Sequence, residues 1–306
     1  MSKKHVKIVE VGPRDGLQNE PAVLPTSVKT EFINSLSETG LSHIEVSSFV
    51  NPRRIPQLAD AADVFSAIKR VPGVHYSALV PNEKGLMAAL ESKVDSVAVF
   101  TAASNKFCKK NINCTVDESI ERFKPILDIA NQRNIPVRAY VSCVLGCPYE
   151  GYISPQKVSR VTKLLWDLGC AEISLGDTIG AGTPKQAREM IQTCLDVVPV
   201  DHLAVHYHDT RGQALANILA SLELGISIID SSVAGLGGCP YADGATGNVA
   251  TEDVVYLLHG LGYETGIDLE KLIGAGKFIC KQIGRTNNSK VSAAGLPMGY
   301  ENYEKS

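Results

Sequence analysis

The chain has 306 residues, 44 % of them hydrophobic and 21 % charged, and its 30 basic and 33 acidic side chains leave a net charge of −3. This balance disfavours a nucleic-acid binder, which needs a basic face to displace counterions from phosphates. No apolar run approaches the roughly 18 residues of a membrane span, and no leader is recognised before the first apolar run. We therefore expect a cytoplasmic enzyme or scaffold with neither a membrane nor a nucleic-acid partner.

Short β-branched and apolar runs alternate with segments of helical periodicity along the chain. Helical periodicity is seen at residues 116–133, 155–168, 184–197 and 213–224, among others. Eight strands alternating with helices predict a (β/α)8 barrel over residues 1–266. Residues 267–306 are expected to add a helix, 269–283, and an irregular tail packed on the barrel. The expected strands cover residues 6–11, 43–49, 75–80, 96–101, 137–144, 172–176, 202–208 and 228–233.

An open, doubly wound sheet has the same alternation of strands and helices. That fold binds dinucleotides with a Gly-x-Gly-x-x-Gly turn after its first strand. Here the turn reads Gly12-Pro13-Arg14-Asp15-Gly16, which does not match. The barrel is therefore the favoured fold.

In such a barrel, functional groups gather at the C-terminal ends of the strands. The first strand ends at the charged pair Arg14 and Asp15, between two glycines, where a functional role competes with a solvated turn. The seventh strand ends at His206 and His208, which point to the same face because residues two apart on a strand do so. Two imidazoles on one face are typical of a metal site, and structural histidines are the alternative.

Asn248 offers a further oxygen ligand, or else an N-cap at the expected start of a helix. With Asp15, His206 and His208 it supplies two oxygens and two nitrogens. This set leaves room for water or substrate oxygens and suits Mg²⁺ or Mn²⁺. A zinc site would instead recruit Cys143 and Cys147, but their Cys-x3-Cys spacing is wider than that of a tight zinc knuckle.

One of the eight cysteines stands apart from the others. Most of them lie in apolar stretches and are expected to be reduced and buried. Cys239 instead follows Gly237 and Gly238, in a loop whose glycines allow close approach to a ligand. This setting indicates a reactive thiol.

At these positions the sequence resembles the 3-hydroxy-3-methylglutaryl-CoA lyase family of barrel metallolyases. The resemblance extends over residues 6–290 and includes the strand with His206 and His208. The segment 232–242, Ser-Val-Ala-Gly-Leu-Gly-Gly-Cys-Pro-Tyr-Ala, is similar to that family's signature loop around its reactive cysteine. The other matching segments are residues 6–20, 141–151 and 172–180.

The resemblance implies a divalent cation and the cleavage of 3-hydroxy-3-methylglutaryl-CoA to acetyl-CoA and acetoacetate. The cation, held by the four ligands above, would act as a Lewis acid toward the substrate hydroxyl. Arg14 would stabilise the charge that develops on the thioester oxygen. Asp15 or His206 would accept the hydroxyl proton, and Cys239 would protonate the enolate carbon.

Three further roles follow from the same resemblance. Glu45 and Asp177, at the ends of the second and sixth strands, would position Arg14 or the metal shell, with Glu45 also near substrate. Gln18 would contact substrate. The CoA phosphates have candidate partners in four cations near barrel-mouth loops, for which a charged loop face is the alternative. These cations are Arg53, Lys106, Lys109 and Lys110.

The nearest alternatives are a related lyase for longer 3-hydroxyacyl-CoA substrates and an isopropylmalate-type acyl-CoA condensing synthase. Such synthases usually carry a further C-terminal region and are not expected to have the Gly-Gly-Cys-Pro loop. A barrel that has lost catalysis and serves as a scaffold would have no reason to keep all of these groups. By resemblance we also expect a homodimer that serves leucine breakdown or ketone-body formation.

Overall fold

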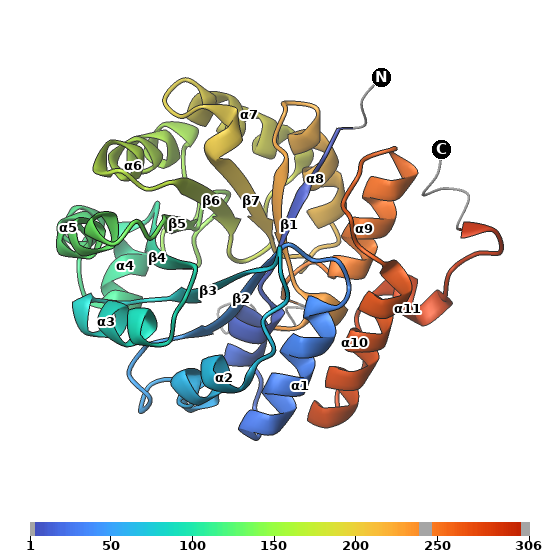
Figure 1. The fold of residues 1–306 in the computed structure, drawn as a ribbon. Helices are drawn as coiled ribbons and strands as arrows, with labels where there is room; N and C mark the ends of the chain where they lie inside the picture. Colours follow the sequence, from blue (N-terminus) through green and yellow to red (C-terminus); the bar gives the residue numbers. More distant parts are fainter. Residues whose placement is uncertain (1–3, 239–246, 301–306) are drawn as a thin grey trace.

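The computed structural model describes residues 4–238 and 247–300. The eight strands are parallel and close into a barrel in sequence order, with β1 paired to both β2 and β8. The predicted (β/α)8 barrel is confirmed (Figure 1), and the open sheet is wrong because every strand has two neighbours. The strands are β1 (Lys7–Glu10), β2 (His43–Ser48), β3 (His75–Leu79), β4 (Ser96–Ala102), β5 (Val137–Ser142), β6 (Glu172–Asp177), β7 (Leu203–Tyr207) and β8 (Ile228–Ser231).

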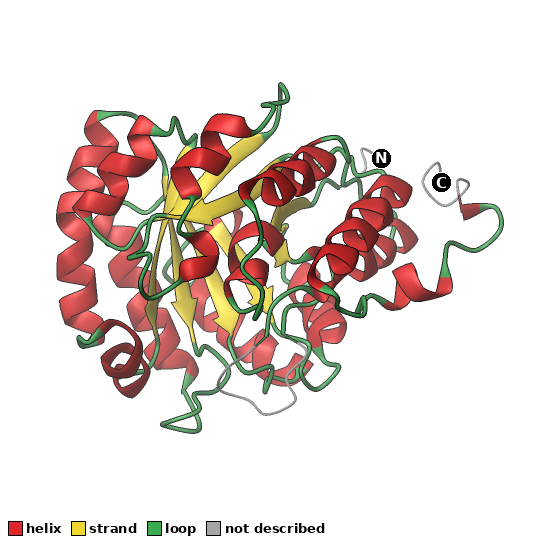
Figure 2. Cartoon of the chain, turned by 90° about the horizontal axis from the view of Figure 1, so that it is seen from below, coloured by secondary structure: helices red, strands yellow, loops and turns green. Residues whose placement is uncertain are grey.

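Helices cover the outside of the barrel (Figure 2). Their ends are set by local chemistry, as where Thr115 and Glu118 each accept a hydrogen bond from the other's backbone N–H in a capping box. Within the described residues, no helix combines the length and apolarity needed to cross a bilayer. The helices are α1 (Thr26–Ser37), α2 (Ala61–Ala67), α3 (Glu83–Glu91), α4 (Asn105–Ile112), α5 (Val116–Gln132), α6 (Pro155–Leu168), α7 (Pro184–Leu195), α8 (Ala214–Leu222), α9 (Thr251–Gly260), α10 (Leu269–Ile283) and α11 (Lys290–Ala294).

Helix α10 lies in the outer ring between α9 and α1 (Figure 1) and packs against both. The backbone of Asp268 donates to the carbonyl of Thr39 at 2.7 Å, which ties the start of α10 to the end of α1. Gly40 allows this approach, because its φ is +90° and a Cβ there would lie 2.0 Å from the carbonyl oxygen of Gly266. The chain after β8 therefore completes the ring of helices around the barrel.

The interior of the barrel holds charged side chains as well as apolar ones. The main apolar core lies between strands and helices, and a smaller cluster that includes Val9 and Ala204 is separate from it. Arg138 on β5 donates to Asp230 on β8 at 2.6 Å, although these strands are not neighbours in the sheet. This ion pair therefore crosses the barrel, below the ends of the strands where functional groups are expected.

Candidate active site

Arg14 and Asp15 lie on a single π-helical turn, Gly12–Gly16, directly after β1. The backbone N–H groups of Asp15 and Gly16 both donate to the carbonyl of Val11, at 2.7 and 3.1 Å. A Cβ at Gly16 would lie 2.8 Å from a side-chain carbon of the loop after β8, so glycine is needed there. Such turns often occur at functional sites, and this one brings two adjacent charged side chains to the barrel mouth.

Asp15 meets the two histidines of β7 at this mouth. In the described part of the chain, Asp15, His206 and His208 are the one group of three metal-ligating side chains, with ligand atoms within 4.8 Å of one another. Oδ2 of Asp15 lies 3.9 Å from Nε2 of His206. Nδ1 of His208 is buried without a hydrogen-bond partner among the described residues, which suits a nitrogen that binds a cation. One carboxylate and two imidazoles fit a divalent metal.

Asn248 is beside this group, but its amide nitrogen faces Asp15. Nδ2 donates to Oδ2 of Asp15 at 2.8 Å and to the carbonyl of Leu236 at 3.1 Å. A β-bridge to His208 places the two residues side by side. Helix α9 begins only at Thr251, after an N-cap at Ala250, so Asn248 is not its N-cap. In this conformation Asn248 orients the Asp15 carboxylate, and ligation through its oxygen would require the amide to rotate.

Two of the three candidate ligands carry the charge state that binds a cation, and a proton competes for the third, His206. Burial favours the neutral form of Asp15, but Arg14 and the histidines outweigh it and lower its pKa to about 2. Burial and the neighbouring His206 lower the pKa of His208 to about 4. For His206 burial acts in the same direction, yet its contact with Asp230 prevails and the pKa is raised. Asp15 is thus ionised and His208 neutral at pH 7, the forms that bind metals.

Arg14 is held from two sides. Its Nε donates to Oε2 of Glu45 at 2.6 Å, and its Nη1 donates to Oδ1 of Asp15 at 2.8 Å. The Tyr140 hydroxyl donates to the same Glu45 oxygen at 3.1 Å, and the guanidinium carbon lies 5.2 Å from the Tyr140 ring centre. Glu45, predicted to position Arg14, is in direct contact with it.

Buried charges behind the site were not singled out from the sequence. Asp230, on β8, lies next to His206, and its Oδ2 is 3.2 Å from Nδ1 of that histidine. It also accepts hydrogen bonds from Arg138 and from Ser174, and Arg138 is paired with Glu172. A carboxylate behind a metal-binding histidine fixes the ring tautomer and orientation. The only available signal is a set of charged residues within apolar strands.

The two remaining predicted residues are placed differently. Gln18 lines a cavity of about 510 Å³ together with Arg14, Asp15 and both histidines. Arg54 also lines it, next to the expected phosphate partner Arg53, which is exposed. Asp177 is buried at the end of β6, where its carboxylate accepts the backbone N–H groups of Ala181 and Gly182 at 3.1 and 2.8 Å. It therefore shapes the loop after β6, and its role toward Arg14 or a metal remains a prediction.

The cysteines bear on two further predictions. Cys239 lies outside the described residues, and its role remains a prediction. All seven other cysteines are free and buried, as expected for most of them. Burial raises the pKa of the Cys143 thiol, and Cys147 donates to the hydroxyl of Ser104 at 3.0 Å. Among the described residues neither thiol belongs to a group of three possible metal ligands, which weighs against the zinc alternative.

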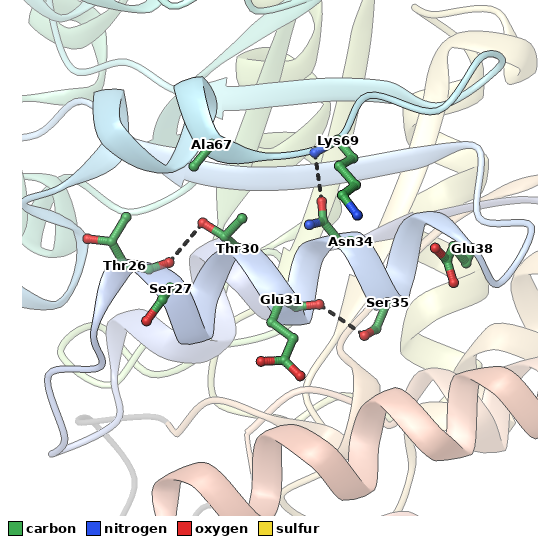
Figure 3. A pocket seen from close by; sticks show the side chains of 9 residues that line it. All are labelled: Thr26, Ser27, Thr30, Glu31, Asn34, Ser35, Glu38, Ala67 and Lys69. Atoms are coloured by element: carbon green, nitrogen blue, oxygen red, sulfur yellow. Dashed lines mark hydrogen bonds between the residues drawn. The ribbon is translucent and has the colours of Figure 1, made fainter.

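A second hollow lies along α1 (Figure 3) and shares no lining residue with the cavity at the barrel mouth. Its polar side chains are largely engaged locally. The hydroxyl of Thr30 donates to the backbone carbonyl of Thr26 at 2.8 Å, and the hydroxyl of Ser35 donates to the backbone carbonyl of Glu31 at 2.9 Å. Oδ1 of Asn34 accepts from the backbone of Lys69 at 2.8 Å. These groups do not converge on a common point, so the cavity at the barrel mouth is the candidate site.

Comparison with known proteins agrees with this geometry. The mitochondrial hydroxymethylglutaryl-CoA lyase of Gallus gallus is 59 % identical over 291 residues, which cover 95 % of this chain and 98 % of that protein. The crystal structure of hydroxymethylglutaryl-CoA lyase from Pseudomonas aeruginosa has a TM-score of 0.94 at 54 % identity and covers 95 % of this chain and 97 % of that one.

A more distant structure carries ligands. It is an HMG-CoA lyase from Acinetobacter baumannii in complex with coenzyme A and 3-methylmalate, with a TM-score of 0.92 at 36 % identity and 96 % coverage of both chains. The model of the HMGL-like family matches residues 5–279 of this sequence, from before β1 into α10. The chain therefore belongs to the HMGL-like family, as its resemblance to the hydroxymethylglutaryl-CoA lyases predicts.

Proposed function

We propose that this chain is a metal-dependent lyase that cleaves 3-hydroxy-3-methylglutaryl-CoA to acetyl-CoA and acetoacetate. The observation that carries the proposal is the cluster of Asp15, His206 and His208 beside the fixed cation Arg14 in one cavity. Relatives named for this activity are 57–60 % identical to this sequence over nearly the whole chain. The lyase therefore takes precedence over a condensing synthase or a scaffold.

Asp15, His206 and His208 would hold the cation, and Asn248 would orient Asp15 or join them through its oxygen. When bound, Mg²⁺ or Mn²⁺ would supply Lewis acidity toward the substrate's hydroxyl and a nearby oxygen. The donor set supports these ions over structural zinc, because it leaves coordination positions open.

The cleavage moves an electron pair from the tertiary hydroxyl into the thioester. The O–H bond breaks, the new ketone of acetoacetate forms, and the carbon–carbon bond opens to leave an enolate of acetyl-CoA. Asp15 and His206 are the two candidates to accept the hydroxyl proton, and both line the cavity. Arg14 would face the enolate oxygen, and Glu45 and Asp15 already hold its guanidinium, so little reorganisation would be needed.

The enolate carbon must then take up a proton. Cys239 is the proposed donor, and Gly238, the residue before it, lines the cavity. Gln18 lines the same cavity and is assigned to substrate contact, with Glu45 acting behind Arg14. Asp177 is assigned to the support of this region through the loop after β6.

The acyl-CoA partner is supported by the Acinetobacter baumannii structure, which holds coenzyme A. Relatives of this chain include proteins named as cytoplasmic and as mitochondrial. We retain a cytoplasmic location, a homodimer, and a part in leucine breakdown or ketone-body formation as predictions.

The deciding experiment is an acetoacetate-release assay on the purified protein before and after chelation with EDTA. We expect activity that disappears on chelation and returns with Mg²⁺ or Mn²⁺. Parallel assays test the two alternative enzymes. One uses 3-hydroxyacyl-CoA substrates with longer acyl chains, and the other uses 2-oxo acids with acetyl-CoA. Acetoacetate release that survives thorough chelation would refute the metal assignment, and turnover of only an alternative substrate would refute the substrate.

A further inference from the structure

Arg285, which follows α10 and its C-cap Gly284, reaches back to the barrel mouth. Its Nη2 donates to the carbonyl of Gly235 at 2.9 Å, and its Nη1 donates to that of Gly237 at 3.4 Å. The same Nη1 forms an ion pair with Glu20, which lies beyond the π-helical turn that carries Arg14 and Asp15. One guanidinium thus joins the loops after β1 and β8 to the C-terminal part of the chain.

The carbonyls held by Arg285 flank a contact to the metal cluster. Between them lies Leu236, whose carbonyl accepts one amide hydrogen of Asn248, while the other goes to Asp15. The two segments are packed too closely here to admit even a Cβ atom at either of two glycines. A Cβ at Gly237 would lie 2.9 Å from Nδ2 of Asn248, and a Cβ at Gly247 would lie 2.3 Å from the carbonyl oxygen of Gly237. A displacement of this short segment would therefore move Asn248 and the Asp15 carboxylate.

We infer that Arg285 is a positioning residue that sets the orientation of Asp15 through residues 235–237 and Asn248. The planar guanidinium suits this task because it presents several N–H groups in a rigid fork, whereas a lysine offers a single mobile ammonium. Arg285 and Glu20 are largely shielded, with 22 % and 9 % of their side chains exposed, so solvent competes weakly for these bonds.

A neighbouring contact supports the same assignment. The backbone of Asn288 donates to the carbonyl of Ala234 at 3.1 Å, one residue before the segment that Arg285 holds. Ala234 has a φ of +58° and Gly235 one of +59°, so this stretch takes a backbone conformation that needs support from its surroundings. The chain after α10 supplies that support, and it is thereby part of the site. This inference rests on the proposed metal-dependent lyase function.

The test compares Arg285→Met and Arg285→Lys with the double variant Arg285→Met/Glu20→Gln. The double variant removes the ion pair without leaving a buried carboxylate unpaired, and so separates positioning from charge balance. Arg188→Met is the matched control, because it breaks an exposed arginine–glutamate pair between α7 and Glu223, the C-cap of α8. For each protein, Mn²⁺ affinity is measured by electron paramagnetic resonance, kcat and KM by acetoacetate release, and folding by circular dichroism.

We expect Arg285→Met to weaken Mn²⁺ binding and lower kcat by roughly ten- to hundredfold, as is usual for residues that orient metal ligands. The double variant should show the same losses, Arg285→Lys a partial loss, and Arg188→Met none. Folded variants with wild-type Mn²⁺ affinity and kcat would overturn the inference, as would full recovery in the double variant. If the wild-type protein neither binds Mn²⁺ nor releases acetoacetate, the proposed function itself has failed.

Discussion

Asp230 lies directly behind His206, its partner on the neighbouring strand, with Oδ2 at 3.2 Å from Nδ1 of the imidazole. Because Asp230 is ionised by its pairing with Arg138, Nδ1 of His206 is the donor in this contact. In the neutral ring Nε2 then carries the lone pair on the side of Asp15, where the proposed cation would bind, and in the free protein a proton competes for this position because Asp230 raises the pKa of His206. The tautomer of this candidate metal ligand is thus set from inside the barrel.

Asp230→Ala is expected to weaken Mn²⁺ binding by roughly ten- to hundredfold, because His206 loses the contact that orients it. Arg138 would also lose one of its two carboxylate partners, so the free energy of unfolding should fall. Titration of the purified variant with Mn²⁺ measures the first effect and urea unfolding the second. Ser174→Ala is the control, since it removes only the hydroxyl that donates to Asp230 at 2.7 Å. Equal Mn²⁺ affinity in Asp230→Ala and wild type would contradict this role.

Arg14→Met should lower kcat by about a thousandfold, because a fixed cation at a developing oxyanion is lost. Glu45→Gln should cost less, about a hundredfold, since it leaves Arg14 in place but loosens its orientation. Tyr140→Phe removes only the hydroxyl contact to Glu45 and should have the smallest effect. Steady-state kinetics with circular dichroism on each variant checks this order. Comparable losses in all three would show that Arg14 acts merely as a structural ion pair.

The sequence alone indicates the barrel and the candidate metal site because short-range patterns mark the strands and their ends, and a barrel brings those ends together. Alternation of strands and helices predicts the fold, and the spacing of His206 and His208 places both side chains on one face. Together with the position of Arg14 and Asp15 at a strand exit, this is enough to locate the mouth of the barrel. Asn248 is singled out only by its place at the expected start of a helix after the eighth strand, and the sequence does not indicate which atom of its amide faces Asp15.

The supporting charges could not be found in this way. Arg138 and Asp230 are 92 positions apart and meet only because the barrel closes. Arg285 lies beyond the barrel strands, in a stretch without a motif, and its contact with Glu20 spans 265 positions. Such pairs have no local periodicity, so they emerge only from the three-dimensional arrangement.

Mn²⁺ is expected to raise the melting temperature of the wild-type protein, because a ligand that binds only the folded state stabilises it. At a concentration of 100 times Kd the gain is about 2.7 kcal/mol. Asp15→Asn should abolish the shift, since it removes the charged ligand from the cluster. The shift in melting temperature is measured by thermal unfolding of EDTA-treated protein with and without added Mn²⁺. Lys185→Gln on the exposed face of α7 is the control, and a shift retained in Asp15→Asn would place Mn²⁺ elsewhere.

Glu252 on α9 provides a prediction about pH and stability that is independent of the metal. Burial raises its pKa to about 8, while a backbone N–H from Ala234 acts in the opposite direction at 2.8 Å. Below about pH 4.5 the carboxyl is protonated in both folded and unfolded chains. Between about pH 4.5 and pH 8 the Glu252 carboxyl is ionised in the unfolded chain but stays protonated in the folded chain. The free energy of unfolding should therefore fall across this window as pH rises.

Glu252→Gln should make this fall shallower, because the amide does not titrate. Each tenfold difference in proton affinity is worth about 1.4 kcal/mol, so urea unfolding from pH 5 to pH 8 resolves the change. Glu10, whose pKa burial raises to about 7, remains in the variant and accounts for a residual slope. Glu270→Gln on the exposed side of α10 serves as control. An identical slope in Glu252→Gln and wild type would mean that Glu252 is already ionised in the folded protein, and that Glu10 and the other groups with raised pKa values carry the pH dependence.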